Sequence, residues 1–121
     1  MSLTRVYEED SWSMIEDGKT LLTVKETEEN GQILVKVSGT LKSEMEHAFK
    51  DELVALITVG MDVIVDCEEL QYIANACQDA LLSVQQTADS INRGSLTLCH
   101  VPPAILEDFR RTNLHELLMI E

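Results

Sequence analysis

The chain has few basic residues. Nine Lys and Arg residues stand against 22 Asp and Glu residues, and the formal net charge over 121 residues is −13. Nucleic-acid affinity rests mainly on Lys and Arg side chains that displace counterions from phosphates, so this balance argues against a nucleic-acid partner. An anionic membrane surface would repel the chain for the same reason. The acidity favours solubility or, in a binding role, a basic protein partner.

Long apolar runs and cysteine pairs are also missing. The longest uninterrupted apolar stretches are only a few residues long and no segment resembles a signal peptide, so we expect no membrane insertion. The cysteines Cys67, Cys77 and Cys99 are odd in number and lack C-x-x-C spacing, which indicates neither a disulfide framework nor a structural zinc site. These absences predict a reduced, soluble protein of the cytoplasm.

The sequence lacks the usual signatures of catalysis. Its three histidines, His47, His100 and His115, are scattered along the chain. There is no H-E-x-x-H, no G-x-S-x-G and no glycine-rich phosphate loop. We therefore predict no enzymatic activity, no cofactor and no metal.

Two features could still carry chemistry. Asp66, Glu68 and Glu69 follow a predicted strand, but they lack a convergent partner such as histidine, and a solvated acidic group is the simpler interpretation. Cys77 falls near a predicted helix start, where the helix dipole can lower the pKa of a thiol. The same residue lies on the apolar side of that helix, which favours a packed and inert thiol.

The chain does contain the alternating pattern of an α/β domain. Aromatic residues make up only 4%, so the core is expected to be aliphatic. Asn30-Gly31 between two alternating apolar segments predicts a hairpin, because both residues accept positive φ. Ser43 and Glu46 have the spacing of a capping box at a helix start, and Gly60 is placed to end that helix.

Periodicity over the rest of the chain predicts further elements. An acidic N-terminal extension over residues 1–19 contains the only tryptophan, Trp12, and a single domain follows over residues 20–121. The expected order is β-β-α-β-α-β-α-β, an α/β fold whose opening hairpin leads into a mixed sheet with parallel later strands. The later predicted elements are strands at 63–65, 95–99 and 117–120, a helix at 76–92, and a third helix that starts at Pro102-Pro103.

Several short motifs occur in a recognisable order over residues 21–120. They are GTLK at 39–42, VIVD at 63–66, LQYI at 70–73, RGSLTL at 93–98 with Val101-Pro102 after it, and LHELL at 114–118. In order and spacing these motifs resemble the STAS domains, the family that includes bacterial anti-sigma factor antagonists. The resemblance implies a STAS-like mixed sheet with helices packed on it. It also implies a regulatory role in signalling and transcription through protein–protein interaction.

The resemblance further locates the position at which the family is switched. Phosphorylated antagonists begin their second helix with Asp-Ser-Ser-Gly or Asp-Ser-Thr-Gly, and a kinase that is itself an anti-sigma factor phosphorylates the serine after the aspartate. The matching residues here are Ala74, Asn75, Ala76 and Cys77. Asn75 at the phosphoacceptor-equivalent position cannot be phosphorylated in this way. The resemblance then implies either a module held in its binding-competent state, because the unphosphorylated form of the family binds the anti-sigma factor, or a scaffold whose partner has changed entirely. Structurally, Asn75 is predicted to cap the helix by accepting a hydrogen bond from the amide of Cys77 or Gln78.

We predict a partner-binding surface at the start of the second helix and in the loop over residues 38–40. Small side chains there would let a partner approach the backbone, and an acidic rim would speed association with a basic partner. The expected partner is a protein of the anti-sigma factor or kinase type, and a homodimer is left open. The alternatives are an accessory subunit of a lipid or anion transport complex, a small-ligand-binding module, and a redox sensor that uses Cys77. The predicted contact residues are Ser38, Gly39, Thr40, Asn75, Ala76, Gln78 and Asp79, with Gln71 and Gln85 at the edges.

Overall fold

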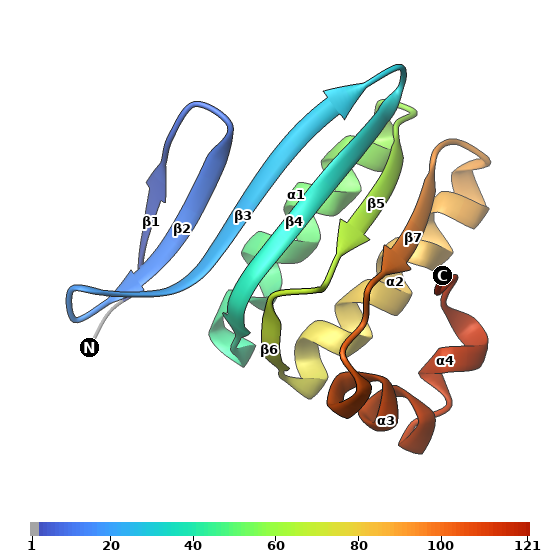
Figure 1. The fold of residues 1–121 in the computed structure, drawn as a ribbon. Helices are drawn as coiled ribbons and strands as arrows, with labels where there is room; N and C mark the ends of the chain where they lie inside the picture. Colours follow the sequence, from blue (N-terminus) through green and yellow to red (C-terminus); the bar gives the residue numbers. More distant parts are fainter. Residues whose placement is uncertain (1–2) are drawn as a thin grey trace.

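The computed structural model describes residues 3–121, which form one mixed sheet of seven strands with helices packed against it (Figure 1). Neighbours follow the order β1-β2-β3-β4-β5-β7, and β6 pairs with the end of β4. The first four strands are antiparallel neighbours, whereas β4, β5 and β7 run parallel. The strands are β1 (Leu3–Tyr7), β2 (Ser11–Glu16), β3 (Lys19–Glu29), β4 (Gln32–Leu41), β5 (Asp62–Asp66), β6 (Leu70–Ile73) and β7 (Ser95–Cys99). The helices are η1 (Ser43–Met45), α1 (Glu46–Thr58), α2 (Asn75–Ile91), α3 (Pro103–Arg111) and α4 (Leu114–Leu117).

The predicted Asn30-Gly31 hairpin is confirmed. Asn30 has φ 54° and Gly31 has φ 81°, and the turn pairs Glu29 with Gln32. Two consecutive positive φ angles give a turn whose twist matches that of the flanking strands. This local signal fixes the register of the two longest strands, β3 and β4.

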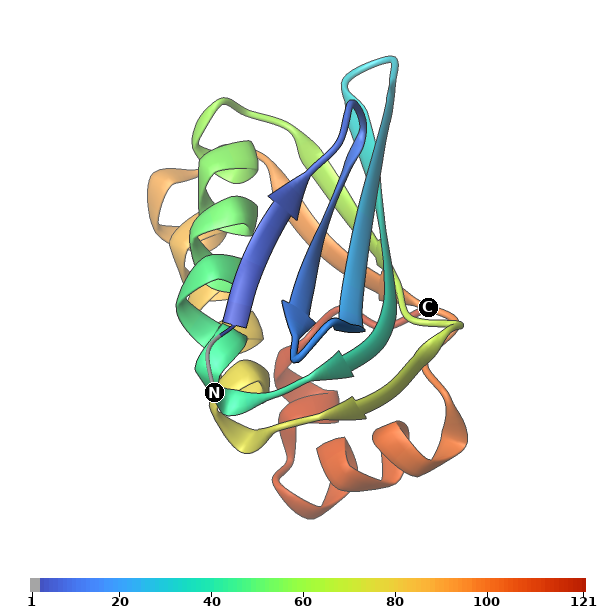
Figure 2. The same ribbon diagram turned by 90° about the vertical axis from the view of Figure 1, so that its left-hand side faces the viewer.

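The helices α1 and α2 cover one face of the sheet (Figure 2). Strands β4, β5 and β7 send alternate apolar side chains to that face, and because the strands pair in register these side chains lie side by side. Among residues 3–121, no helix is long and apolar enough to cross a membrane. The largest side chains with less than 2% exposure are Phe49, Phe109, Leu22, Leu41, Met45, Leu53, Ile57, Leu96 and Leu98.

The N-terminal segment contributes two strands to the sheet. Residues 1–19 are predicted to be an acidic extension, and within the described part of it β1 and β2 continue the antiparallel order beyond β3. Trp12 and Met14 on β2 are buried, at 3% and 7% exposure, and belong to the main core. The segment therefore packs as part of the domain.

Two local predictions are wrong. Ser43 does not cap a helix, because it begins a short 3-10 turn in which the Met45 amide donates to the Lys42 carbonyl (2.9 Å) and no side chain takes that place. The strand predicted over residues 117–120 is also largely absent. Leu117 ends the short helix α4, and the segment after it forms a single parallel bridge between Ile120 and Leu98 of β7.

Candidate partner-binding site

The helix α2 begins almost directly after β6, with only Ala74 between the two elements. Ala74 is buried and extended, its amide donates to the Leu41 carbonyl (2.8 Å), and its own carbonyl accepts from the amides of Cys77 and Gln78 (both 3.0 Å). The helix therefore has Ala74 as its N-cap and Asn75 as its first helical residue. The prediction that Asn75 caps the helix is wrong, because β6 leads the chain into α2 one residue earlier. Asn75 is instead exposed, and no side chain caps this helix.

Cys77 and Gln78 are turned into the protein. The Cys77 thiol is fully buried and donates to the Lys42 carbonyl (3.4 Å). Burial raises its pKa to about 11, and the charges of Glu46 and Glu44 act in the same direction. A thiol with a raised pKa is a poor nucleophile at neutral pH, which supports the packed, inert interpretation. Gln78 is 3% exposed, and its side-chain amide donates to the Ile73 carbonyl (3.2 Å).

Gln78 is therefore unsuited to the contact role predicted for it. Its side chain ties the first turn of α2 to the end of β6 and is satisfied inside the protein. Gln85, predicted at the edge of the surface, is also buried and donates to Asp89 (3.3 Å). Both residues lie outside the surface that we consider below.

Residues 38–40 belong to the strand β4 rather than to a loop. A register shift between Gly39 and Thr40 bends β4 there and aligns Thr40 with Tyr72 of β6. Gly39 has φ 104°, and a Cβ at this position would clash with the backbone carbonyl of Leu21, so the bend requires glycine. Ser38, Gly39 and Thr40 are half-buried.

The structure brings part of the predicted surface together. The pairing of β4 with β6 sets Thr40 beside Tyr72, and β6 leads directly into the helix start. Asn75 and Asp79 are exposed and lie one turn apart on α2, and Ala76 is half-buried between them in sequence. Sequence reasoning missed Tyr72, which is 53% exposed. The two exposed residues between buried Leu70 and Ile73 break strict alternation, so the apolar motif LQYI did not reveal which side chains face outward.

Residues 24–121 of this chain match a family model described as "Mlab, STAS domain". The chain belongs to the STAS domain family. No curated protein matches the chain significantly in sequence. The seven-stranded mixed sheet with its packed helices is the STAS fold, as the resemblance implied.

Solved STAS structures share this fold at low sequence identity. An anti-sigma factor antagonist from Mycobacterium paratuberculosis is 15% identical, with a TM-score of 0.69, over 82% of this chain and 84% of that one. A Thermotoga maritima protein described as an anti-sigma factor antagonist is 14% identical, with a TM-score of 0.72, over 80% and 84%. The anti-sigma factor antagonist SpoIIAA in its unphosphorylated form is 13% identical, with a TM-score of 0.68, over 81% and 87%.

Asp66, the last residue of β5 in this STAS domain, has a histidine partner, contrary to the prediction. His100 Nδ1 lies 3.1 Å from Asp66 Oδ1, and Cys99 stands beside both. Glu69 instead forms an ion pair with Lys36 (3.3 Å). The histidine was missed because it is 34 residues from Asp66 in sequence, and only the pairing of β5 with β7 brings the two together.

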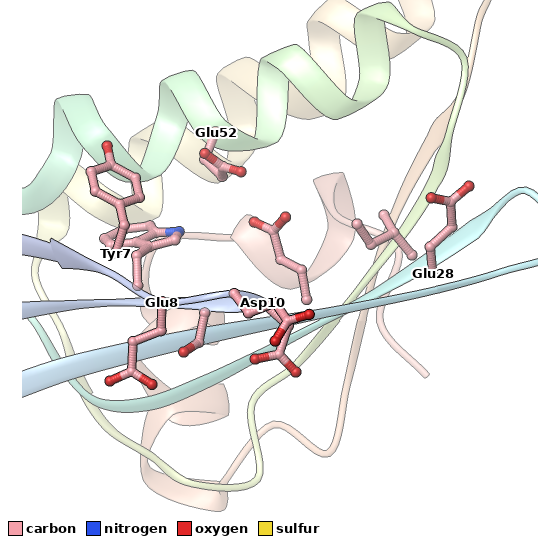
Figure 3. Close-up of a pocket in the computed structure, with 10 residues that line it drawn as sticks. Tyr7, Glu8, Asp10, Glu28 and Glu52 are labelled. Atoms are coloured by element: carbon pink, nitrogen blue, oxygen red, sulfur yellow. The ribbon is translucent and has the colours of Figure 1, made fainter.

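A cavity of about 330 Å³ lies between the β1–β2 hairpin and α1 (Figure 3). Glu52 reaches from α1 toward the strands and pairs with the Arg5 guanidinium (3.3 Å). The Arg5 guanidinium also lies over the rings of Trp12 (4.0 Å) and Tyr7 (4.8 Å). The pKa of the Glu26 carboxyl is raised to about 7, with burial as the largest cause. The hydrogen bond to Glu52 and the charge of Glu52 also raise this pKa, and the charge of Arg5 lowers it. These residues are too far apart in sequence for any local pattern to connect them.

Proposed function

We propose that this STAS domain is a non-enzymatic, cytoplasmic regulatory module that binds a protein partner through the start of α2 and the adjoining end of β4. The contact surface comprises Thr40, Tyr72, Asn75, Ala76 and Asp79. We call it the helix-start surface. The proposal rests on the combination of a rigid base and exposed, small or polar side chains at the position where the family carries its switch.

The rigid base comes from the inward-facing residues. Cys77 and Gln78 both donate to backbone carbonyls, and the Ala74 amide donates to β4, so the first turn of α2 is tied to two strands. A surface that is ordered before binding loses little conformational entropy when a partner docks. The small side chain of Ala76 leaves the backbone accessible, and Tyr72 offers the kind of exposed aromatic ring that often anchors an interface.

The loss of the phosphoacceptor gives the surface a constant charge. A phosphate at the family's serine position would add about −1.5 to −2 charges at pH 7. Asn75 is neutral and has no hydroxyl, so this form of regulation is excluded at that residue. The module would then be controlled by its own abundance or by the availability of the partner.

A second candidate is an accessory subunit of a transport complex. The matching family model is named after Mlab rather than after an anti-sigma factor antagonist, and the residues of the helix start depart from the antagonist motif. Both candidates use a protein interface. They differ in the partner that the helix-start surface recognises.

The test replaces Ala76 with arginine. The long cationic side chain of Ala76→Arg would prevent close approach to the helix backbone while leaving the core untouched. Gln86→Arg on the exposed side of the same helix adds the same charge away from the helix start and serves as the matched control. Wild type and both variants, each shown to unfold at a similar temperature, are immobilised and exposed to lysate of the native organism, and retained proteins are identified by mass spectrometry.

We expect one partner to be retained by wild type and Gln86→Arg and lost with Ala76→Arg. If the partner retained in this way is an anti-sigma factor or related kinase, the regulatory role is supported. If it is a transporter subunit, the second candidate is supported. Equal retention by all three proteins would contradict the assignment of the surface.

A further inference from the structure

The carboxyl ends of β5 and β7 lie side by side, and each contributes metal-binding side chains. The register of this parallel pair sets Asp66 opposite Cys99. Side chains of paired residues project from the same face of a sheet. His100, the next residue after β7, places Nδ1 at 3.1 Å from Asp66 Oδ1. One donor atom from each of these three residues lies within 4.8 Å of the other two.

The backbone holds the three side chains in place. The Cys67 amide donates to the Cys99 carbonyl (2.9 Å), which ties the two strand ends together. The Glu68 amide donates to Asp66 Oδ1 (3.0 Å) and so orients the carboxylate. His100 has φ 55°, a left-handed conformation that is uncommon for residues other than glycine. Such outliers persist where surrounding structure enforces them and are frequent at functional sites.

The electrostatic surroundings favour a cation. The carboxylates of Asp66, Glu68 and Glu121 place negative charge around the Cys99 thiol. Lys36, which is aligned with Asp66 on β4, forms its ion pair with Glu69. Asp66 is mostly buried, with a side-chain exposure of 14%, whereas the His100 ring is 62% exposed. The cluster is therefore anchored inside and open to solvent on one side.

We propose that Asp66, Cys99 and His100 bind a divalent ion of the zinc type. Thiolate, imidazole and carboxylate are all ligands of Zn²⁺, at distances of about 2.0 to 2.3 Å. Two ligands at about 2.05 Å from a tetrahedral centre are about 3.3 Å apart, close to the 3.1 Å between Asp66 and His100.

Binding exchanges a proton for the ion. The metal–sulfur bond forms as the Cys99 S–H bond breaks, and the thiol proton passes to solvent. The imidazole binds through a neutral ring nitrogen, and Asp66 binds as a carboxylate. Three protein ligands leave a coordination position open to water or to a group from another molecule. The site is independent of the proposed partner surface, and a failure of either proposal leaves the other standing.

The test is metal titration of the reduced, tag-free chain after treatment with a chelator. Calorimetry with Zn²⁺ is expected to show one saturable site at micromolar affinity or better. The heat of binding should depend on the ionisation heat of the buffer in the way expected for release of about one proton per bound ion. Co²⁺ as a probe should give the near-ultraviolet charge-transfer band of a cobalt–thiolate bond.

Three variants and one control locate the site. Cys99→Ser, Asp66→Asn and His100→Asn each remove a ligand with little change in shape, and asparagine tolerates the left-handed backbone at position 100. Each should weaken Zn²⁺ binding by at least about tenfold, a loss that changes in metal sites commonly cause. Cys99→Ser should also abolish the cobalt–thiolate band.

The control is His47→Gln, since His47 Nε2 forms a similar exposed pair with Asp51 (3.2 Å) on α1. His47→Gln should bind Zn²⁺ like wild type. The proposal is overturned if wild type shows no saturable site, if the cobalt–thiolate band is absent, or if the three variants bind as tightly as the control.

Discussion

One sheet contains both the antiparallel strands β1 to β3 and the parallel strands β4, β5 and β7. The two sets of strands differ in where their polar side chains lie. The strands β1 and β2 precede the residues that match the family model, and they enclose titratable groups against α1. The parallel half keeps the STAS arrangement and places its polar groups at strand and helix ends. We infer that the added strands contribute mainly to stability, whereas the partner surface and the metal site proposed above both lie at strand or helix ends.

The largest expected effect tests whether β2 is integral to the domain. Trp12→Ala would remove a side chain that is 3% exposed and that also stacks on Arg5. Truncation of a buried tryptophan costs about 3 to 5 kcal/mol of unfolding free energy. Urea unfolding followed by circular dichroism measures it.

Tyr7→Ala is the matched control, because Tyr7 contacts the same guanidinium but is 66% exposed. We expect it to cost no more than about 1 kcal/mol. Similar small losses for both variants would mean that β1 and β2 are dispensable to the core, and the contrast between the two halves would fail.

A smaller effect concerns the protonation of Glu26. The folded protein holds this proton up to a pKa of about 7, whereas the unfolded chain releases it near the ordinary value of 4.5. The folded state therefore binds more protons between these values, so its stabilisation is full below about pH 4.5 and is lost as the pH rises through 7. At this partly solvated site the contribution is on the order of 1 kcal/mol after screening.

Glu26→Gln, which is neutral at every pH, should flatten the pH dependence of stability between pH 5 and pH 8. Glu28→Gln, a neighbouring exposed carboxylate on the same strand, should leave it unchanged. Urea unfolding at several pH values provides the comparison. A slope in Glu26→Gln equal to that of wild type would contradict the assignment of this proton to Glu26.

Local signals in the sequence predicted much of the fold. Asn30-Gly31 required two positive φ angles, and Pro102-Pro103 placed the start of the third helix within one residue. The run 63–65 identified a central parallel strand, and β5 indeed lies between β4 and β7 in the sheet. These features depend on neighbours in sequence, and the STAS motifs supplied their order.

Nonlocal contacts account for what the sequence did not reveal. Asn75 has the chemistry of a cap, but the backbone of β6 extends to Ala74 and moves the cap by one residue. Gln78 is polar, yet its side-chain amide donates a hydrogen bond to the Ile73 carbonyl, which holds the side chain inside the protein. Only strand pairing brings His100 to Asp66. Each outcome depends on a partner whose position the fold determines.

The smallest effect separates stability from binding at the start of α2. Asn75→Asp would add a negative charge at the first residue of the helix, next to amides that no side chain caps. Such a charge interacts favourably with the helix dipole and should stabilise the domain by about 0.3 to 1 kcal/mol. The same charge partly imitates the phosphate that the family carries here, and it should weaken partner binding while thermal stability rises.

Thermal unfolding and partner retention, measured on the same samples, reveal whether the two effects oppose each other. Asp79→Asn removes a negative charge from the helix-start surface one turn further along α2. It should change stability less than Asn75→Asp does, because the dipole effect falls off beyond the first turn. If Asn75→Asp raises stability and leaves binding intact, the partner does not sense charge at this position. Under the proposed function, asparagine at the position equivalent to the family's phosphoacceptor would then reflect a change of partner. A partner that still distinguished a phosphorylated from an unphosphorylated site would reject the added charge.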